Sequence, residues 1–229
     1  MKKFNKLTIA CMLSLFGLTF LHAQDWADLN HFKDANEKLP AAQQDDNRIV
    51  FMGNSITIGW LNLRPEFFKN KTYVNRGISG QTTPQMLLRF RQDVVNLDPK
   101  AVILLAGTND IAGNTGPSTL EMIMDNIKGM SEIAKASGIK VILTSTLPAY
   151  DYPWKPGLEP SGKIIALNNM IKEYSESQGH IYVDYFSAMV DDRNGLPKKY
   201  AEDEVHPTVA GYKVMEPLVE AAIAKVIKE

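Results

Sequence analysis

The sequence predicts an α/β fold in which a mostly parallel sheet is covered by helices on both faces, a three-layer α/β/α sandwich. Short apolar runs alternate along the chain with longer segments that carry apolar residues at spacings of three and four. This alternation of strand and helix patterns is typical of parallel sheets. The chain has 229 residues, of which 45% are hydrophobic and 22% charged, and these values suit one globular domain with a full core.

The predicted strands are five apolar runs of a few residues each. They cover Ile49–Met52, Tyr73–Asn75, Ala101–Ala106, Lys140–Ser145 and Ile181–Asp184. The third and fourth runs are continuously apolar at Val102–Leu105 and Val141–Leu143. Parallel strands that helices cover on both faces have this composition, so these two runs are expected to be such strands.

The predicted helices lie between and after these runs. They cover Pro84–Leu97, Ser118–Ser137, Ser161–Gln178 and Val209–Lys228. Ser118, with Glu121 three residues later, forms a capping-box pattern at the start of the second helix, and Gly138 and Gly179 stand where C-terminal caps belong. The segment 25–44 is expected to be a helical lead-in.

The first 23 residues are expected to be a secretory signal peptide. Lys2, Lys3 and Lys6 precede an apolar stretch of about 15 residues that ends at Leu21, which is short for the roughly 20 needed to span a bilayer. Ala23 offers a small residue for cleavage, so residues 24–229 would be the exported domain, periplasmic or extracellular, with no stable membrane insertion. A retained N-terminal anchor is the alternative.

Cleavage would also change the composition of the mature chain. The lone cysteine, Cys11, would leave with the signal peptide, so no disulfide or thiol nucleophile is expected. Three lysines and no acidic residue would be removed from a formal net charge of −1. This mildly acidic balance gives no reason to expect nucleic acid as a partner.

Polar residues follow three of the predicted strands directly. Ser55 follows the first strand in Gly53-Asn54-Ser55, Gly80 follows the second in Gly77-Ile78-Ser79-Gly80, and Asn109 follows the third in Gly107-Thr108-Asn109-Asp110. In a doubly wound sheet such loops converge on one crevice at the carboxyl ends of the strands. Asp203-Glu204-Val205-His206 precedes the last helix and could reach the same crevice.

Each of these residues has an ordinary structural interpretation when it is considered alone. A serine after a strand is usually a helix cap, and Gly80 or Asn109 alone would be turn residues. His206 alone would be a surface histidine. The functional interpretation depends on all four segments occurring together, each after its own strand or before the last helix.

Taken together, the four segments resemble the SGNH, or GDSL-type, esterases and acylhydrolases. The segments occur in the order typical of that family and span residues 53–207. Asn54 stands where many members have Asp, and both residues have short polar side chains that tolerate a tight turn. The resemblance implies a flavodoxin-like, five-stranded parallel sheet, the SGNH hydrolase fold.

The resemblance also implies a role for each site residue. Ser55 would be the nucleophile, His206 the general base and Asp203 the acid that orients the imidazole. The oxyanion would be held by the backbone N–H groups of Ser55 and Gly80 and by the side-chain amide of Asn109. Neighbouring polar residues are expected to be structural, namely Arg76, Asp110 and Asp184.

The loop 147–160 is rich in proline and aromatic residues and follows the fourth strand. Trp154 is a candidate substrate-binding residue, as part of an aromatic wall for a sugar or an acyl chain. Tyr150 and Tyr152 are expected instead to hold the loop against the body of the protein. The same structural role is the alternative for Trp154.

Several other classes of enzyme lack their motifs in this chain. Ser55 does not lie in a Gly-x-Ser-x-Gly elbow, and no phosphate-binding or dinucleotide-binding glycine motif is present. Beyond the signal segment, His31, His180 and His206 do not have the spacing of metal ligands. We therefore expect neither a metal nor another cofactor.

The resulting hypothesis is a secreted serine esterase that hydrolyses small acyl esters, acetyl esters above all, on carbohydrates through an acyl-enzyme at Ser55. One alternative is a lysophospholipase or thioesterase that acts on longer acyl chains. Another is a carbohydrate-binding module that keeps the fold and lacks the chemistry.

Overall fold

The protein folds around a five-stranded sheet in the computed structural model, which describes residues 25–43 and 46–228. The strands lie in the order β2-β1-β3-β4-β5, and every neighbouring pair is parallel. Each predicted strand is confirmed, with ends that differ by one or two residues. The strands are β1 (Ile49–Gly53), β2 (Tyr73–Gly77), β3 (Ala101–Leu105), β4 (Lys140–Thr144) and β5 (Ile181–Val183).

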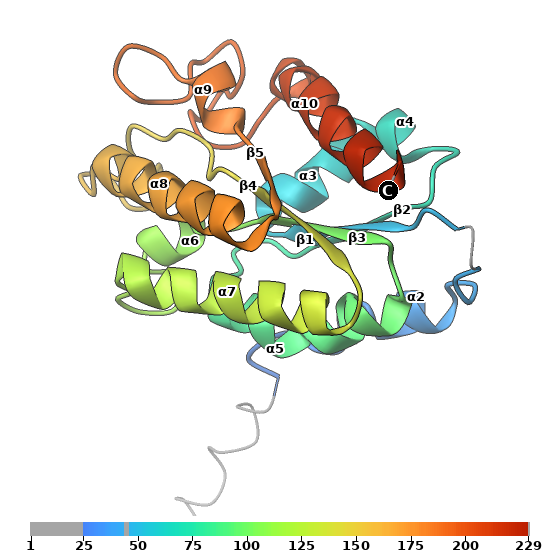
Figure 1. Cartoon of the computed structure of the whole chain (residues 1–229). Helices are drawn as coiled ribbons and strands as arrows, with labels where there is room; N and C mark the ends of the chain where they lie inside the picture. Colours follow the sequence, from blue (N-terminus) through green and yellow to red (C-terminus); the bar gives the residue numbers. More distant parts are fainter. Residues whose placement is uncertain (1–24, 44–45, 229) are drawn as a thin grey trace, which may run out of the picture.

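Helices cover both faces of this sheet and confirm the three-layer sandwich (Figure 1). One face packs against α5 (Thr83–Asp93), α7 (Leu120–Ala136) and α8 (Ser161–Gln178). The other face packs against α3 (Ser55–Leu63), α4 (Pro65–Phe68), α9 (Tyr185–Met189) and α10 (Val209–Lys228). Shorter elements are α2 (Lys33–Glu37), the 3-10 helix η1 (Val95–Leu97) and α6 (Thr108–Ile111).

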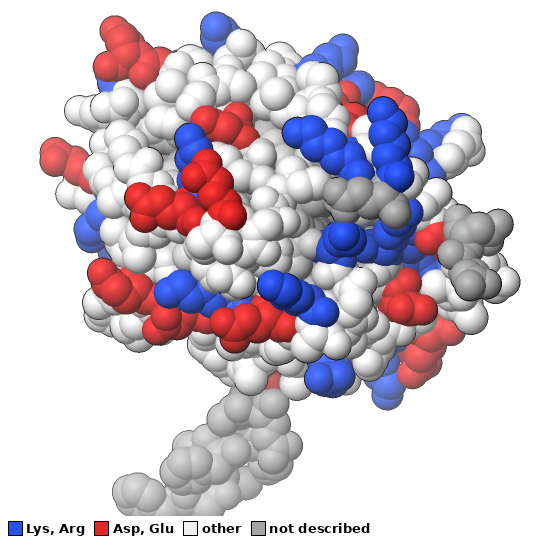
Figure 2. Space-filling model, in the orientation of Figure 1, with Lys and Arg blue, Asp and Glu red and all other residues white. Residues whose placement is uncertain are grey.

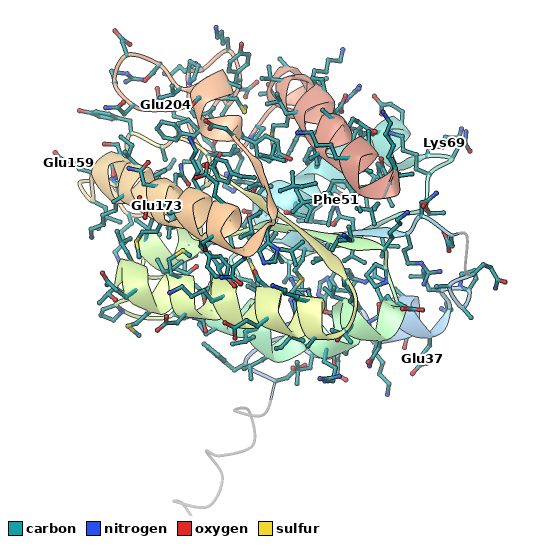
Figure 3. The ribbon with its side chains drawn as sticks, in the orientation of Figure 1. Glu37, Phe51, Lys69, Glu159, Glu173 and Glu204 are labelled. Atoms are coloured by element: carbon teal, nitrogen blue, oxygen red, sulfur yellow. The ribbon has the colours of Figure 1, made fainter. Side chains whose placement is uncertain are left out.

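Alternation along the strands divides the core into two parts. Val50 and Met52 of β1 belong to the apolar cluster under α5, α7 and α8, whereas Ile49 and Phe51 belong to the cluster under α3, α4 and α10. Successive side chains of a strand point to opposite faces, so β1 supplies both clusters. Figure 3 shows Phe51 inside the molecule, while Glu37, Lys69 and Glu159 lie near its edge.

Two of the predicted helix ends are confirmed and one predicted start is wrong. Gly138 and Gly179 follow α7 and α8 with φ of 76° and 70°, the left-handed conformation typical of C-terminal caps. The start of α7 is capped by Thr119, whose hydroxyl accepts from Met122 N at 3.3 Å. The expected capping box of Ser118 and Glu121 therefore does not form, because the helix begins one residue later.

The predicted helical lead-in is mostly wrong. Of residues 25–43, only Lys33–Glu37 forms a helix, because Pro40 disfavours helical backbone at Leu39 and Asp28 has a φ of 55°. This segment is held by side-chain contacts with the body instead. Asn36 donates to Asp93 Oδ1 at 2.7 Å and accepts from Arg76.

The predicted signal peptide lies outside the described residues. Within residues 25–43 and 46–228, no helix combines the length and the apolar character needed to cross a membrane. Acidic and basic side chains are interspersed over most of the face shown in Figure 2.

The strand order places a topological switch point between β1 and β3. From β1 the chain passes outward to β2 and then returns past β1 to β3, so the connections leave β1 and β3 in opposite directions. Open α/β sheets bind ligands at the carboxyl ends of the strands at such a point. Ser55 directly follows β1, and Asn109 lies in α6 directly after β3.

Candidate active site

Ser55 is the first residue of α3, but it does not cap that helix. The cap is Asn54, whose Oδ1 accepts from Ile56 N at 3.0 Å. The turn before Ser55 is so tight that only glycine fits at position 53: a Cβ there would lie 2.1 Å from Thr57 Oγ1 and 2.8 Å from Leu105 O. Since Asn54 performs the capping, the Ser55 hydroxyl is available for another partner.

That partner is His206. Ser55 Oγ lies 2.9 Å from His206 Nε2, and His206 Nδ1 lies 2.7 Å from Asp203 Oδ2. Hydroxyl, imidazole and carboxylate thus form one hydrogen-bonded row. Its first two members, Ser55 and His206, are 151 positions apart in the chain. In this order the imidazole can accept a proton from Ser55 while its Nδ1–H donates to Asp203.

Asp203 is held by its own loop as well as by the imidazole ring. Its Oδ1 accepts from His206 N at 2.7 Å and from Val205 N at 3.0 Å. Partial burial acts to raise the pKa of Asp203, but the hydrogen bonds from the His206 side chain and the two backbone groups together hold it below its ordinary value. The carboxylate is therefore ionised at neutral pH, as an acceptor for an imidazolium must be.

The three predicted oxyanion donors follow the carboxyl ends of β1, β2 and β3. Within the described part of the chain, the backbone N–H groups of Ser55 and Gly80 donate to no acceptor. Gly80 has a φ of 77°, a conformation that favours glycine. Asn109 is buried, and its Nδ2 donates to Gln81 O at 2.9 Å. An amide nitrogen carries two hydrogens, so one remains for a ligand.

The sequence of this region matches a known family. The sequence model of the GDSL-like lipase/acylhydrolase family matches residues 51–214. The chain belongs to the GDSL-like lipase/acylhydrolase family.

Solved structures of similar proteins agree with this family. A candidate acylhydrolase from Bacteroides fragilis is 47% identical, with a TM-score of 0.87 over 89% of this chain and 99% of that one. A GDSL-like lipase from Bacteroides thetaiotaomicron is 44% identical, with a TM-score of 0.85 over 87% of this chain and 98% of that one. The predicted family and its five-stranded fold are confirmed.

A curated relative has a named activity. The acetylxylan esterase of Xylanibacter ruminicola is 25% identical over 91% of this chain and 49% of its own length. The chain spans about half the length of the curated relatives it matches.

Polar residues beside the GDSL-family segments are structural, as expected. Asp110 accepts from Thr83 N at 2.9 Å and from Thr83 Oγ1 at 2.6 Å, which fixes the start of α5. Burial raises the pKa of Asp110 to about 6. Asp184 caps α9 by accepting from Ser187 N at 2.9 Å. Arg76 donates to Asn36 Oδ1 through Nε at 2.9 Å and through Nη2 at 2.6 Å.

The aromatic residues of the loop 147–160 have three different settings. Tyr152 is fully buried and its hydroxyl lies 2.9 Å from Thr108 Oγ1, so it holds the loop against α6. Trp154 stacks on Tyr152 with ring centroids 4.9 Å apart, lies 5.9 Å from the His206 ring and is 43% exposed. Tyr150 lies instead beside Arg193. Trp154 is thus the aromatic side chain beside the GDSL-family site.

Two open cavities are lined by predicted site residues, one by Asp203 and His206 and the other by Gly80. A cavity of about 770 Å³ is lined by Leu63, Lys198, Lys199, Glu202, Asp203, His206 and neighbours. A second of about 460 Å³ is lined by Asp28, Ile78, Ser79, Gly80, Gln81, Gln85, Asn114 and Thr115.

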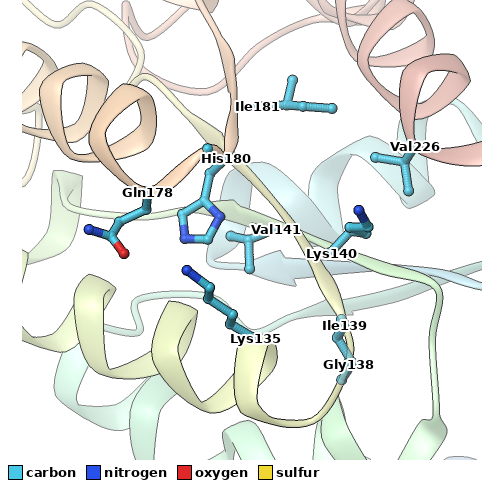
Figure 4. A pocket seen from close by; sticks show the side chains of 10 residues that line it. Lys135, Gly138, Ile139, Lys140, Val141, Gln178, His180, Ile181 and Val226 are labelled. Atoms are coloured by element: carbon cyan, nitrogen blue, oxygen red, sulfur yellow. The ribbon is translucent and has the colours of Figure 1, made fainter. Parts of the chain in front are cut away.

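A further cavity lies away from this site. It has a volume of about 350 Å³ and opens at the amino ends of β4 and β5, where Lys135, Gln178 and His180 surround it (Figure 4). None of the predicted site residues lines it. Across residues 25–43 and 46–228, no three acidic, histidine or cysteine side chains gather closely enough to hold a metal ion.

Two site residues were not predicted from the sequence. Asn114 contacts both Asn109 and Gly80, and Arg89 donates to Gly53 O at 3.1 Å and to Gln81 Oε1 at 2.5 Å. The glycines at 113 and 116, both with positive φ, are a sequence signal for a tight turn that could have drawn attention to Asn114.

Proposed function

We propose that this protein is a serine esterase that removes small acyl groups, acetyl above all, from carbohydrates. The observation that carries the proposal is the row in which Ser55 Oγ lies 2.9 Å from His206 Nε2 and His206 Nδ1 lies 2.7 Å from Asp203 Oδ2. A serine becomes a useful nucleophile when a positioned base can accept its proton.

In the first half of the reaction, Ser55 Oγ attacks the carbonyl carbon of the ester while His206 Nε2 accepts the hydroxyl proton. The oxyanion that develops accepts hydrogen bonds from the N–H groups of Ser55 and Gly80 and from Asn109 Nδ2. The tetrahedral intermediate then expels the alcohol, which takes the proton from His206. The acyl group remains on Ser55.

In the second half, water attacks the acyl-enzyme and His206 accepts its proton. The second tetrahedral intermediate uses the same three donors. Its collapse releases the carboxylic acid, and His206 returns the proton to Ser55 Oγ. Asp203 stays ionised throughout, because its role is to accept from Nδ1 and to stabilise the imidazolium.

Three observations support a carbohydrate ester as the substrate. Trp154, exposed and 5.9 Å from His206, offers a flat apolar surface of the kind on which sugar rings can pack. Polar residues, among them Ser79, Gln85 and Thr115, line the cavity of about 460 Å³, which suits a hydroxyl-rich ligand. The curated relative at 25% identity is named an acetylxylan esterase.

An acyl-chain profile and a polysaccharide assay test the proposal together. With p-nitrophenyl esters we expect the highest kcat/KM for acetate, and with acetylated xylan we expect release of acetate. Ser55→Ala is the control, and it should abolish both activities and the labelling by a fluorophosphonate probe. Rising activity toward octanoate and longer chains would instead identify an enzyme for lipids or thioesters, with Leu63 and Val209 lining its acyl site. Folded protein that the probe does not label would indicate a binding module.

Export is part of the proposal and is supported by the sequence alone. Three lysines followed by a short apolar stretch and Ala23 match a cleavable signal peptide. Mass spectrometry of the protein recovered outside the cytoplasm should find Gln24 at the N-terminus. A mature protein that begins at Met1 would contradict cleavage.

A further inference from the structure

Asn114 touches the candidate oxyanion donors and the aromatic wall at once. Its Nδ2 donates to Asn109 Oδ1 at 3.1 Å and to Gly80 O at 3.3 Å, and its Oδ1 accepts from Trp154 Nε1 at 3.3 Å. An asparagine amide has two N–H hydrogens, so both are used inside the site. Although its side chain is exposed, Asn114 is bonded to three groups that the proposed function uses.

The backbone around Asn114 is fixed independently of these contacts. Asn114 N donates to Asn109 O at 3.0 Å. The flanking Gly113 and Gly116 have φ of 71° and 110°, which gives the turn a shape that other residues rarely adopt. Lys155 Nζ closes the turn by donating to Ala112 O at 2.6 Å. The Asn114 amide is therefore presented from a rigid support.

We propose that Asn114 is a positioning residue for the oxyanion site: it holds the Asn109 amide and the Gly80 loop in place and connects both to Trp154. This inference rests on the proposed function. Asn109 is held at both ends of its amide, because Oδ1 accepts from Asn114 while Nδ2 donates to Gln81 O. With both ends held, the second N–H of Nδ2 keeps one direction. The hydrogen bond from Asn114 Nδ2 to Gly80 O restrains Gly80, whose backbone N–H is another of the predicted oxyanion donors.

Loss of Asn114 should lower kcat for p-nitrophenyl acetate and leave its KM little changed, because this ester carries no sugar to pack on Trp154. A displacement of about 1 Å in a catalytic group can cost about 10²-fold in rate, whereas removal of an oxyanion donor itself costs about 10²–10³-fold. We expect Asn114→Ala to lower kcat for p-nitrophenyl acetate by about 10- to 100-fold, less than Asn109→Ala does. Asn114→Asp keeps an acceptor for Trp154 but loses both N–H donors. Its kcat should fall at least as far as that of Asn114→Ala.

The double variant Asn109→Ala/Asn114→Ala separates positioning from an independent effect. If Asn114 acts through Asn109, the double variant should lose far less than the product of the two single losses. Asn96→Ala is the matched control, since Asn96 is exposed in η1 and makes no side-chain hydrogen bond in the described part of the chain. It should retain the kcat of the wild type.

A measurement without turnover completes the test. In ¹⁵N-labelled protein, the side-chain amide signals of Asn109, assigned by their loss in Asn109→Ala, should shift and exchange faster with solvent in Asn114→Ala but not in Asn96→Ala. Unchanged signals, a raised KM at constant kcat, or multiplied losses in the double variant would each overturn the positioning role. An inactive wild-type protein whose Asn109 signals still respond to Asn114→Ala would contradict the proposed function and leave the positioning of Asn109 standing.

Discussion

Arg89 is a buried charge that connects several segments next to the candidate active site. It is fully buried on α5 and forms an ion pair with Asp93, also fully buried, at 3.0 Å. The guanidinium donates in addition to Gly53 O, Arg76 O and Gln81 Oε1. One side chain thus joins the carboxyl ends of β1 and β2 to the loop that carries Gly80.

The replacement Arg89→Met keeps much of the side-chain volume and removes every one of these bonds. It leaves the Asp93 carboxylate buried with Asn36 as its remaining hydrogen-bond donor. Removing one partner of a buried ion pair costs about 3–5 kcal/mol, compared with a total stability of about 5–15 kcal/mol for a typical protein. We therefore expect the free energy of unfolding to fall by about 3–5 kcal/mol.

Urea unfolding followed by far-UV circular dichroism measures this loss. Arg91→Met is the matched control, since Arg91 is exposed on the same helix, and it should change stability by less than about 0.5 kcal/mol. Arg89→Met/Asp93→Asn should recover part of the loss, with a coupling of about 0.5–3 kcal/mol. Equal stabilities for Arg89→Met and Arg91→Met would refute the reasoning.

Two further predictions concern residues next to the site. Burial raises the pKa of Asp110 to about 6, above its unfolded value of about 3.9, so its stabilising contribution is complete below pH 4 and is lost as pH rises through 6. The stability of the wild type relative to Asp110→Asn should therefore fall by up to about 3 kcal/mol between pH 4 and 7, and a constant difference in urea titrations would contradict the burial effect. In Gly77→Ala, the added Cβ would lie 2.3 Å from Ile58 N and 2.8 Å from Asn54 O. We therefore expect the free energy of unfolding to fall by about 1–3 kcal/mol. Fluorophosphonate labelling of Ser55 should also be slower. Gly129→Ala is its control, because the nearest atom to that Cβ lies 3.6 Å away. This variant should raise the free energy of unfolding by about 0.4–1 kcal/mol. A similar loss of stability in both variants would refute the steric clash at Gly77.

The sheet could be predicted from the sequence because its strands are buried on both faces. Val102–Leu105 is continuously apolar, and a run of this kind has few alternatives in a chain of this length. The start of α7 was less certain because Ser118 and Thr119 both carry a hydroxyl that can cap a helix. Packing of the helix against the sheet decides which of the two residues becomes the cap. This packing cannot be derived from the sequence pattern.

The site was predictable to a similar extent. Ser55, Gly80 and Asn109 each follow a strand, and His206 lies three residues after Asp203, so their order along the chain indicated a common location. Asn114 and Arg89 follow no such rule. Their importance comes from which carbonyl and amide groups they reach after folding, and that depends on turn geometry and helix placement.

The short loop that carries Asp203 and His206 holds these two side chains against each other. Asp203 accepts from both the ring and the backbone of His206, and the buried Val205 between them anchors the loop in the core. A shift of this loop would carry acid and base together, so the tautomer of the imidazole would persist while the distance to Ser55 changed. In the proposed mechanism, activation of Ser55 would then change with the separation between its Oγ and His206 Nε2, which is 2.9 Å here. Transfer of the loop to a related scaffold would carry the hydrogen bonds between Asp203 and His206 with it. The distance between the imidazole and the serine of the new scaffold would then need adjustment.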